Sequence, residues 1–128
     1  MGRILSMFVL ILLAFPGTAL AKDYRSFETR EGVTVPTVII APHNPKAVVI
    51  LFAGGSGTIR IQPDGTIRRA GNFLVASRKK FTKHGLVAVV IDAPSDQTDG
   101  GSVMEFDFRE SEDHARDISL IVTALRKT

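Results

Sequence analysis

Two unbroken apolar runs of strand length constrain the fold of this chain more than any other feature. Residues Ala47–Phe52 read AVVILF, and residues Leu86–Ile91 read LVAVVI. Strands that are apolar on both faces are typical of parallel sheets that helices cover on both sides. The segment between the two runs is long enough for a right-handed crossover through a helix. The sequence therefore predicts an α/β fold that contains a parallel pair of strands.

A β-hairpin is predicted before the first apolar run. Residues Tyr24–Glu31 and Val33–Ala41 are rich in β-branched and aromatic residues, and Glu31-Gly32 is a turn signal. Pro42 and Pro45 then prevent both a helix and a continued strand, because proline lacks the backbone donor.

Two helices are expected, one after each apolar run. The first is expected to begin at Asn72, a good N-cap, and to end at His84 with Gly85 just beyond it. The second is expected to begin around Ser111. Its apolar positions recur at spacings of three and four, as on one face of a helix: Ala115, Ile118, Ile121, Val122 and Leu125.

The first 21 residues have the pattern of a secretory signal peptide. Arg3 supplies a positive charge, Ile4–Phe15 is almost entirely apolar but too short to span a bilayer, and Ala19-Leu20-Ala21 is a cleavage signal. We therefore expect an exported protein, periplasmic or secreted, that meets the membrane only through the signal peptide. The alternatives are a buried N-terminal helix and a retained anchor. Residues 22–128 are expected to form one small domain.

Charge and cysteine content exclude some classes of function. The net charge of +3 is too weak to imply a nucleic-acid partner, although seven basic residues lie between positions 60 and 83 and nine acidic residues between 92 and 117. We interpret these runs as solvated helix faces of opposite charge rather than as a nucleic-acid or anionic-lipid patch. The absence of cysteine excludes thiol chemistry and disulfides.

A glycine-rich segment directly follows the first apolar run. Residues Phe52–Gly57 read FAGGSG, and such glycines let backbone N–H groups approach a ligand closely. An oxyanion loop is one interpretation, with the backbone of Gly54, Gly55 and Ser56 as the candidate. A phosphate loop lacks its G-x-x-x-x-G-K-[ST] or G-x-G-x-x-G pattern. A nucleophile elbow at Ser56 would need a helix directly after it, which Pro63 and the β-branched residues before it disfavour. An ordinary tight turn is the remaining alternative.

The order of these elements resembles the N-terminal half of an α/β hydrolase. The resemblance lies in a strand followed by FAGGSG, a helix, a strand ending in IDAPSD, and a helix that begins with acidic residues. It is to secreted or periplasmic bacterial members and dienelactone-hydrolase-like enzymes, and it covers nearly all of residues 22–128. It implies a partial hydrolase fold: a three-layer α/β/α arrangement with an N-terminal hairpin, two parallel βα units and an incomplete sheet.

The same resemblance implies a serine hydrolase that acts on an ester or related acyl bond of a small molecule, with no cofactor. In that family the loop after the third strand supplies an oxyanion-hole N–H, and the nucleophile lies in a later G-x-S-x-G. The nucleophile, the acid and the histidine would then lie beyond Thr128. We therefore expect no catalytic side chain within this chain, and we expect the chain to be a truncated product or an inactive fragment.

The polar residues after the second apolar run are expected to serve the same site without forming a metal centre. Asp92 and Asp96 are candidates for the rim of a substrate cleft, and with Asp99 they do not match the spacing of a calcium loop. An internal triad of Ser56, an aspartate and a histidine is disfavoured. His43, His84 and His114 are interpreted as structural or solvent-exposed residues.

A binding domain is the alternative from a different class. In that interpretation the chain is an exported, non-catalytic flavodoxin-like or Rossmann-like domain, and its glycine loop holds an anion such as phosphate at the edge of the sheet.

Overall fold

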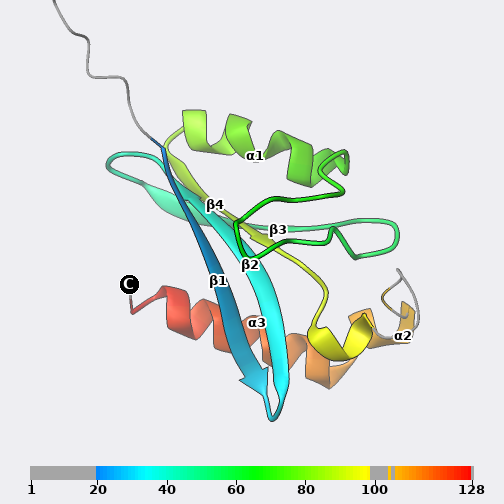
Figure 1. Cartoon of the computed structure of the whole chain (residues 1–128). Helices are drawn as coiled ribbons and strands as arrows, with labels where there is room; N and C mark the ends of the chain where they lie inside the picture. The colour runs from blue at the N-terminus through cyan, green and yellow to red at the C-terminus, as the bar shows by residue number, and fades with distance from the viewer. Residues whose placement is uncertain (1–19, 99–103, 105, 128) are drawn as a thin grey trace, which may run out of the picture.

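The computed structural model describes residues 20–98, 104 and 106–127 (Figure 1). The expected signal peptide over residues 1–21 lies almost wholly outside this part of the chain. The described elements, in chain order, are β1 (Ala21–Arg30), β2 (Val33–Ala41), β3 (Ala47–Phe52), α1 (Phe73–Lys83), β4 (Leu86–Ile91), the short 3-10 helix η1 (Ser95–Gln97), α2 (Phe106–Arg109) and α3 (Glu112–Leu125).

The four strands form one mixed sheet in the order β1-β2-β4-β3. The predicted hairpin is confirmed: β1 pairs antiparallel with β2, and Gly32 in the turn adopts a positive φ of 70°. The predicted parallel pair is also confirmed, since β3 runs alongside β4 with Ala47 opposite Leu86 and Phe52 opposite Ile91. The antiparallel strand β2 covers the other side of β4.

This strand order gives the two apolar strands different environments. The central strand β4 is buried over its last four residues, as expected of a strand that is covered on both faces. By contrast, β3 lies at the edge of the described sheet, and its Val48 is 54% exposed. The sequence could not distinguish the two, because both runs are equally apolar.

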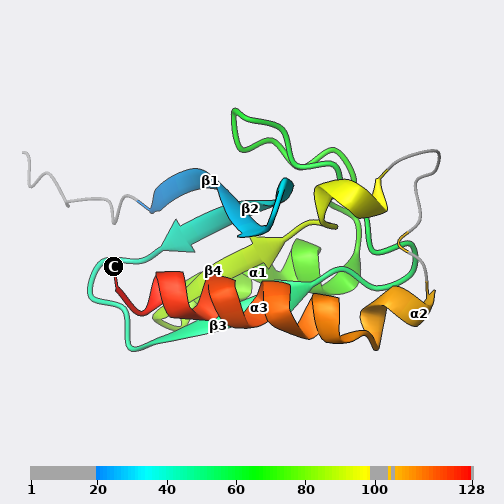
Figure 2. The same ribbon diagram turned by 90° about the horizontal axis from the view of Figure 1, so that it is seen from below.

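Helices cover both faces of the sheet, which produces three layers (Figures 1 and 2). On one face, Val75 of α1 packs with Val38, Leu51 and Val90 of the sheet. On the other face, Ile121 of α3 packs with three sheet residues, Val35, Val89 and Ile91. The α/β class predicted from the sequence is therefore confirmed.

The helix ends follow the predicted capping positions. Asn72 precedes α1 as predicted, but its side chain does not cap the helix, and its Nδ2 donates instead to the carbonyl of Gly54 at 3.4 Å. His84 and Gly85 close α1, with a φ of 81° at Gly85. Ser111 caps α3 with its side chain, which accepts a hydrogen bond from the backbone N–H of His114. The predicted apolar stripe on this helix is only partly right, since Ile121 is buried but Ala115 is exposed.

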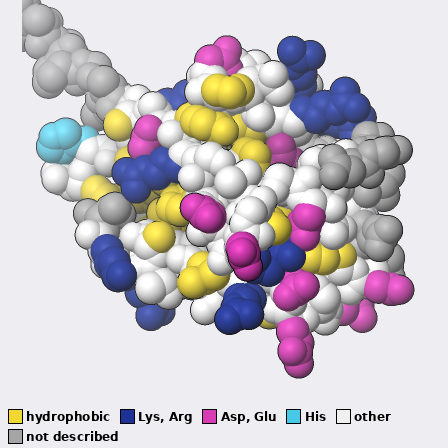
Figure 3. All heavy atoms as spheres, turned by 60° about the horizontal axis from the view of Figure 1, so that its bottom comes forward, with side chains coloured by type: hydrophobic (Ala, Val, Ile, Leu, Met, Phe, Trp, Pro, Cys, Tyr) yellow, Lys and Arg dark blue, Asp and Glu magenta, His cyan; other side chains and the backbone are white. Residues whose placement is uncertain are grey.

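Part of each charge run lies on a helix end that suits its sign. Lys80 and Lys83 occupy the last turn of α1, and Glu112 and Asp113 occupy the first turn of α3. A helix dipole favours cations at its C-terminus and anions at its N-terminus. Figure 3 shows acidic side chains gathered on the side of the molecule where α3 begins. The interpretation as solvated helix faces is only partly right, because three basic residues precede α1 and two acidic residues, Asp92 and Asp117, are buried.

Candidate active site at the glycine loop

The glycine loop, residues 53–57, leaves β3 at the carboxyl edge of the parallel pair. Gly55 and Gly57 adopt positive φ values of 60° and 75°, and the N–H of Gly57 donates to the carbonyl of Gly54 at 3.3 Å. No described residue accepts a hydrogen bond from the backbone N–H groups of Gly54, Gly55 and Ser56. Gly54 and Gly55 are exposed, so these donors can reach a ligand.

Asp92 holds the segment that follows the glycine loop. Its Oδ1 accepts from the N–H of Ile59 at 2.8 Å, and its Oδ2 accepts from the N–H of Ile61 at 2.7 Å. Oδ1 also accepts from Ala93 at 2.9 Å. The residue is only 7% exposed. Asp92, expected at a cleft rim, thus lines a cavity beside the glycine loop. Its carboxylate holds the segment that follows the loop.

Arg109, at the end of α2, and Met104, two residues before α2, hold the glycine loop. Arg109 Nη2 donates to the carbonyl of Gly55, and the N–H of Met104 donates to the carbonyl of Ser56 at 2.7 Å. A Cβ atom at Gly57 would lie 2.7 Å from Arg109 Nη2. The positive φ of Gly57 favours glycine, and an added Cβ would also lie 3.0 Å from Met104 Cβ and displace the end of the Arg109 side chain.

Two cavities lie at the glycine loop. Cavity 1, of about 90 Å³, is lined by Phe52, Ala53, Gly57, Ile91, Asp92, Met104, Arg109 and His114. Cavity 2, of about 420 Å³, is lined by Gly54, Ser56, Thr58, Ile59, Arg69, Gly71 and Asn72. The loop thus contributes Gly57 to one cavity and Gly54 and Ser56 to the other.

His114 is a residue of cavity 1 that the sequence analysis assigned to solvent or structure. Its ring meets the rings of Phe52 and Phe108 edge to face, with centroid distances of 6.2 Å and 5.2 Å. Its Nδ1 is buried and has no hydrogen-bond partner among the described residues. Burial lowers the pKa of His114, and the cations Arg109 and Arg30 lower it further, against the opposing charge of Asp117. A histidine in the first turn of a predicted helix carries no sequence pattern that would indicate a buried Nδ1.

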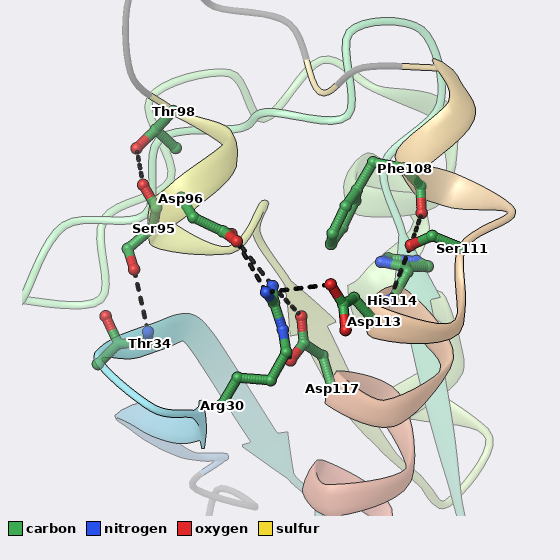
Figure 4. Close-up of polar contacts among 10 residues, drawn as sticks. All are labelled: Arg30, Thr34, Ser95, Asp96, Thr98, Phe108, Ser111, Asp113, His114 and Asp117. Atoms are coloured by element: carbon green, nitrogen blue, oxygen red, sulfur yellow. Dashed lines mark hydrogen bonds and ion pairs between the residues drawn. The ribbon is translucent and has the colours of Figure 1, made fainter.

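Asp96 lies in a different cluster, on Arg30 at the end of β1 (Figure 4). Arg30 donates to Asp96 at 2.8 and 3.1 Å and to Asp117 of α3 at 2.8 and 3.0 Å. These carboxylates, Asp117 first, raise the pKa of the Arg30 guanidinium. The guanidinium also lies 5.5 Å from the centre of the Phe108 ring. Asp96 therefore joins η1 to β1 and α3, and it does not line cavity 1 or cavity 2.

The remaining serine and histidine candidates are not brought together. Ser56 Oγ lies 3.4 Å from Thr58 Oγ1 and within hydrogen-bond distance of the Thr58 carbonyl. His43 lies with Gly85 in a cavity at the amino edge of β3 and β4, the edge opposite the glycine loop. His84 is exposed at the C-terminus of α1.

Searches for other kinds of site within the described residues were negative. Among the described residues, no group of three or more histidine, aspartate or glutamate side chains is placed to hold a metal ion. In the same part of the chain, no helix has the length and apolar character needed to cross a membrane. Comparison of the chain with protein-family models, curated proteins and solved structures finds no match.

Proposed function

We propose that this chain is the N-terminal part of a serine hydrolase of the α/β-hydrolase type, in which the glycine loop forms half of an oxyanion hole. The observation that carries the proposal is the set of N–H groups on Gly54, Gly55 and Ser56, which lack described acceptors and are exposed or half-buried at the carboxyl edge of the sheet. Preorganised donors of this kind stabilise the negative oxygen that forms when an acyl bond is attacked.

The rigidity of the loop supports this role. An oxyanion hole lowers a barrier only if its donors are already in place before the reaction. Asp92 fixes the segment after the loop with bonds to Ile59 and Ile61, and Arg109 fixes the carbonyl of Gly55. None of these contacts uses the N–H groups of Gly54, Gly55 and Ser56, which stay available to a ligand.

The open edge of β3 suggests where the nucleophile would come from. An oxyanion donor must lie within about 3 Å of the oxygen of the carbonyl under attack, so the nucleophile must approach the glycine loop closely. A further parallel strand beside β3 would end next to that loop. An apolar groove of about 300 Å³ runs along this edge, lined by Val48, Ile50, Val122, Leu125 and Arg126.

A small activated ester, p-nitrophenyl acetate, tests the proposal. We expect no turnover by the 128-residue chain and measurable turnover by a form extended with its natural downstream sequence. Activity of the short chain that Ser56→Ala abolishes would overturn the assignment of Ser56 to an oxyanion loop. Failure of the extended form to hydrolyse any acyl substrate would overturn the hydrolase assignment.

A matched pair of variants at Gly54 isolates the backbone donor in the extended form. Gly54→Pro removes the N–H, whereas Gly54→Ala keeps it, and an added Cβ would meet only Asn72 Nδ2 at 3.5 Å. Loss of one oxyanion donor costs about 10²–10³ in kcat. We expect a loss of that size for the proline variant and near-normal kcat for the alanine variant. Equal rates in both would contradict a catalytic role of this N–H.

Cavity 2 supports a second candidate, a domain that binds an anion at the glycine loop. Arg69 Nη1 donates to Thr58 Oγ1 at 3.2 Å, and both line this cavity with Ser56 near the start of α1. A phosphate held there would stabilise the folded chain. We would then expect phosphate to raise the melting temperature more than sodium chloride of equal ionic strength. Arg69→Gln would abolish the increase, and Arg68→Gln, at an exposed position, would keep it.

A further inference from the structure

Cavity 1 has one apolar part and one polar part. Phe52, Ile91 and Met104 supply apolar surface from the ends of β3 and β4 and from the segment before α2. Arg109 and His114 line the same cavity from α2 and α3. A pocket in which a few polar groups converge within an apolar wall is the usual form of a small-molecule site.

Both polar groups have unused hydrogen-bonding capacity. Arg109 carries five N–H donors, of which Nη2 donates to the carbonyl of Gly55, and no described carboxylate forms an ion pair with it. The buried Nδ1 of His114 has no partner within the described part of the chain. A ligand in the cavity reaches this atom only if the His114 ring turns, because Nδ1 is buried. A buried polar atom without a partner is costly, so a turn that satisfies it would add affinity.

Asp92 does not cancel this capacity. Both of its carboxylate oxygens accept backbone hydrogen bonds, from Ile59, Ile61 and Ala93. These bonds stabilise the carboxylate but do not remove its charge, so Asp92 and Arg109 both contribute a charge to the cavity wall. Arg109 forms no ion pair with Asp92 or with any other described carboxylate.

We propose that cavity 1 binds a short aliphatic carboxylate, with the charged end at Arg109 and His114 and the hydrocarbon end against the apolar wall. The size of the cavity supports a short chain. One water needs at least about 10–15 Å³ of such space, so about 90 Å³ holds only a few non-hydrogen atoms. Arginine donors match a carboxylate, and the Nδ1–H form of a neutral imidazole adds one further donor.

The inference also names a product class for the proposed hydrolase, and to that extent it rests on the proposed function. A short carboxylate is the acid that ester hydrolysis releases, and cavity 1 includes Gly57 of the glycine loop. Cavity 1 would therefore hold the short-chain acid after hydrolysis.

Titration with sodium propionate tests the site directly in the purified chain. We expect the His114 ring signals and the Gly57 amide signal in NMR spectra to shift with a dissociation constant on the order of 1–10 mM, as suits a ligand of five non-hydrogen atoms. Propionamide has the same shape without the charge, and we expect it to bind at least tenfold more weakly. Absence of these shifts at 100 mM propionate, or equal binding of propionamide, would overturn the proposal.

Variants of Arg109 and His114 test whether these residues bind propionate. We expect Arg109→Met to weaken propionate binding at least tenfold and Arg116→Met, which removes the same charge from an exposed position of α3, to leave it unchanged. Because Arg109 also holds Gly55, His114→Phe is the second variant: it keeps a ring beside Phe52 and Phe108 but removes Nδ1. Unaltered affinity in His114→Phe or in a folded Arg109→Met protein would refute the assignment.

The outcomes separate this inference from the proposed function. Propionate binding without ester turnover by the extended form would remove the hydrolase assignment and keep the site. Ester turnover by the extended form without propionate binding would remove the site and keep the hydrolase assignment.

Discussion

Asp92 shows how one side chain can organise a loop that lies far away in the sequence. Its neighbours along the chain suggest only a polar residue after a buried strand. In the fold, its two oxygens accept hydrogen bonds from residues about thirty positions earlier, and the carboxylate is almost fully buried. Burial of a charge is tolerated when it is hydrogen-bonded in this way. The segment that follows the glycine loop therefore depends on Asp92 for its position.

We expect Asp92→Asn to lower the free energy of unfolding by about 2–3 kcal/mol, the cost of losing hydrogen bonds to a buried charge. An amide has one acceptor oxygen, so at least one of the loop N–H groups would face an NH2 group. Urea denaturation measures the change. Asp23→Asn is the control, because Asp23 is exposed and, among the described residues, forms an ion pair with Arg25 alone. We expect a loss of less than about 1 kcal/mol there. Equal losses would contradict the anchoring role.

His114 makes stability depend on pH. Its pKa in the folded protein is lowered, chiefly by burial, from an ordinary value of 6.5. Above that value the imidazole is neutral in both states, whereas below it the unfolded chain takes up the proton first. The free energy of unfolding should therefore fall as the pH drops below 6.5.

Urea denaturation between pH 5 and 8 measures this effect. We expect His114→Phe to have a shallower decline toward low pH than the wild type. His84→Gln should keep the wild-type slope, because His84 is exposed. A His114→Phe curve parallel to the wild-type curve would show that His114 does not contribute.

At the scale of elements, Arg30 connects three segments that are distant in the sequence. It lies at the end of β1 and bonds Asp96 of η1 and Asp117 of α3 (Figure 4). The nearby Thr34 N–H donates to Ser95 Oγ at 3.0 Å, which ties β2 to the same short helix. These contacts fix the hairpin tip against the start of α3. Phe108, which packs on both Arg30 and His114, links this cluster to cavity 1.

The two aspartates of α3 near Arg30 should differ in their contribution. The Asp117 side chain is 3% exposed and bonds Arg30 at 2.8 Å, whereas that of Asp113 is 61% exposed at 3.7 Å. We expect Asp117→Asn to cost about 2–4 kcal/mol, because it disrupts a buried ion pair. We expect Asp113→Asn to cost less than about 0.5 kcal/mol. Chemical denaturation of both variants checks the difference, and similar costs would refute the contribution assigned to burial.

At the scale of the whole molecule, the main feature is the asymmetry of the sheet. The hairpin covers one side of β4, while β3 is left at the edge with an apolar groove beside it. An exposed apolar edge strand is a template for pairing with another chain. We therefore expect the chain by itself to associate as its concentration rises.

Val48→Lys should reduce this association, because a lysine on an edge strand opposes edge-to-edge pairing. Sedimentation velocity over a range of concentrations measures the effect. Phe73→Lys is the matched control: Phe73 is 80% exposed but lies on α1, away from the edge. If Phe73→Lys reduced association as much as Val48→Lys, general surface hydrophobicity would explain it instead. A wild-type chain that stays monomeric would contradict the expectation.

The sequence by itself determined the type and approximate limits of the main elements. The apolar runs, the Glu31-Gly32 turn and the cap residue Ser111 act over a few positions, and each is found where it was predicted. Asn72 lies at the predicted start of α1 but does not cap it with its side chain. It also determined that the glycine loop follows β3 directly. Local patterns are reliable here because backbone conformation depends mainly on neighbouring residues.

Only the tertiary structure decided which of these residues act together. It placed β3 at the edge and β4 at the centre, brought Asp92 to the backbone of Ile59 and Ile61, and separated Asp96 from the glycine loop. It also buried the Nδ1 atom of His114, a half-buried polar residue in the first turn of a helix. These outcomes depend on contacts between segments far apart in the chain, and such contacts leave no periodic pattern in the sequence around each residue.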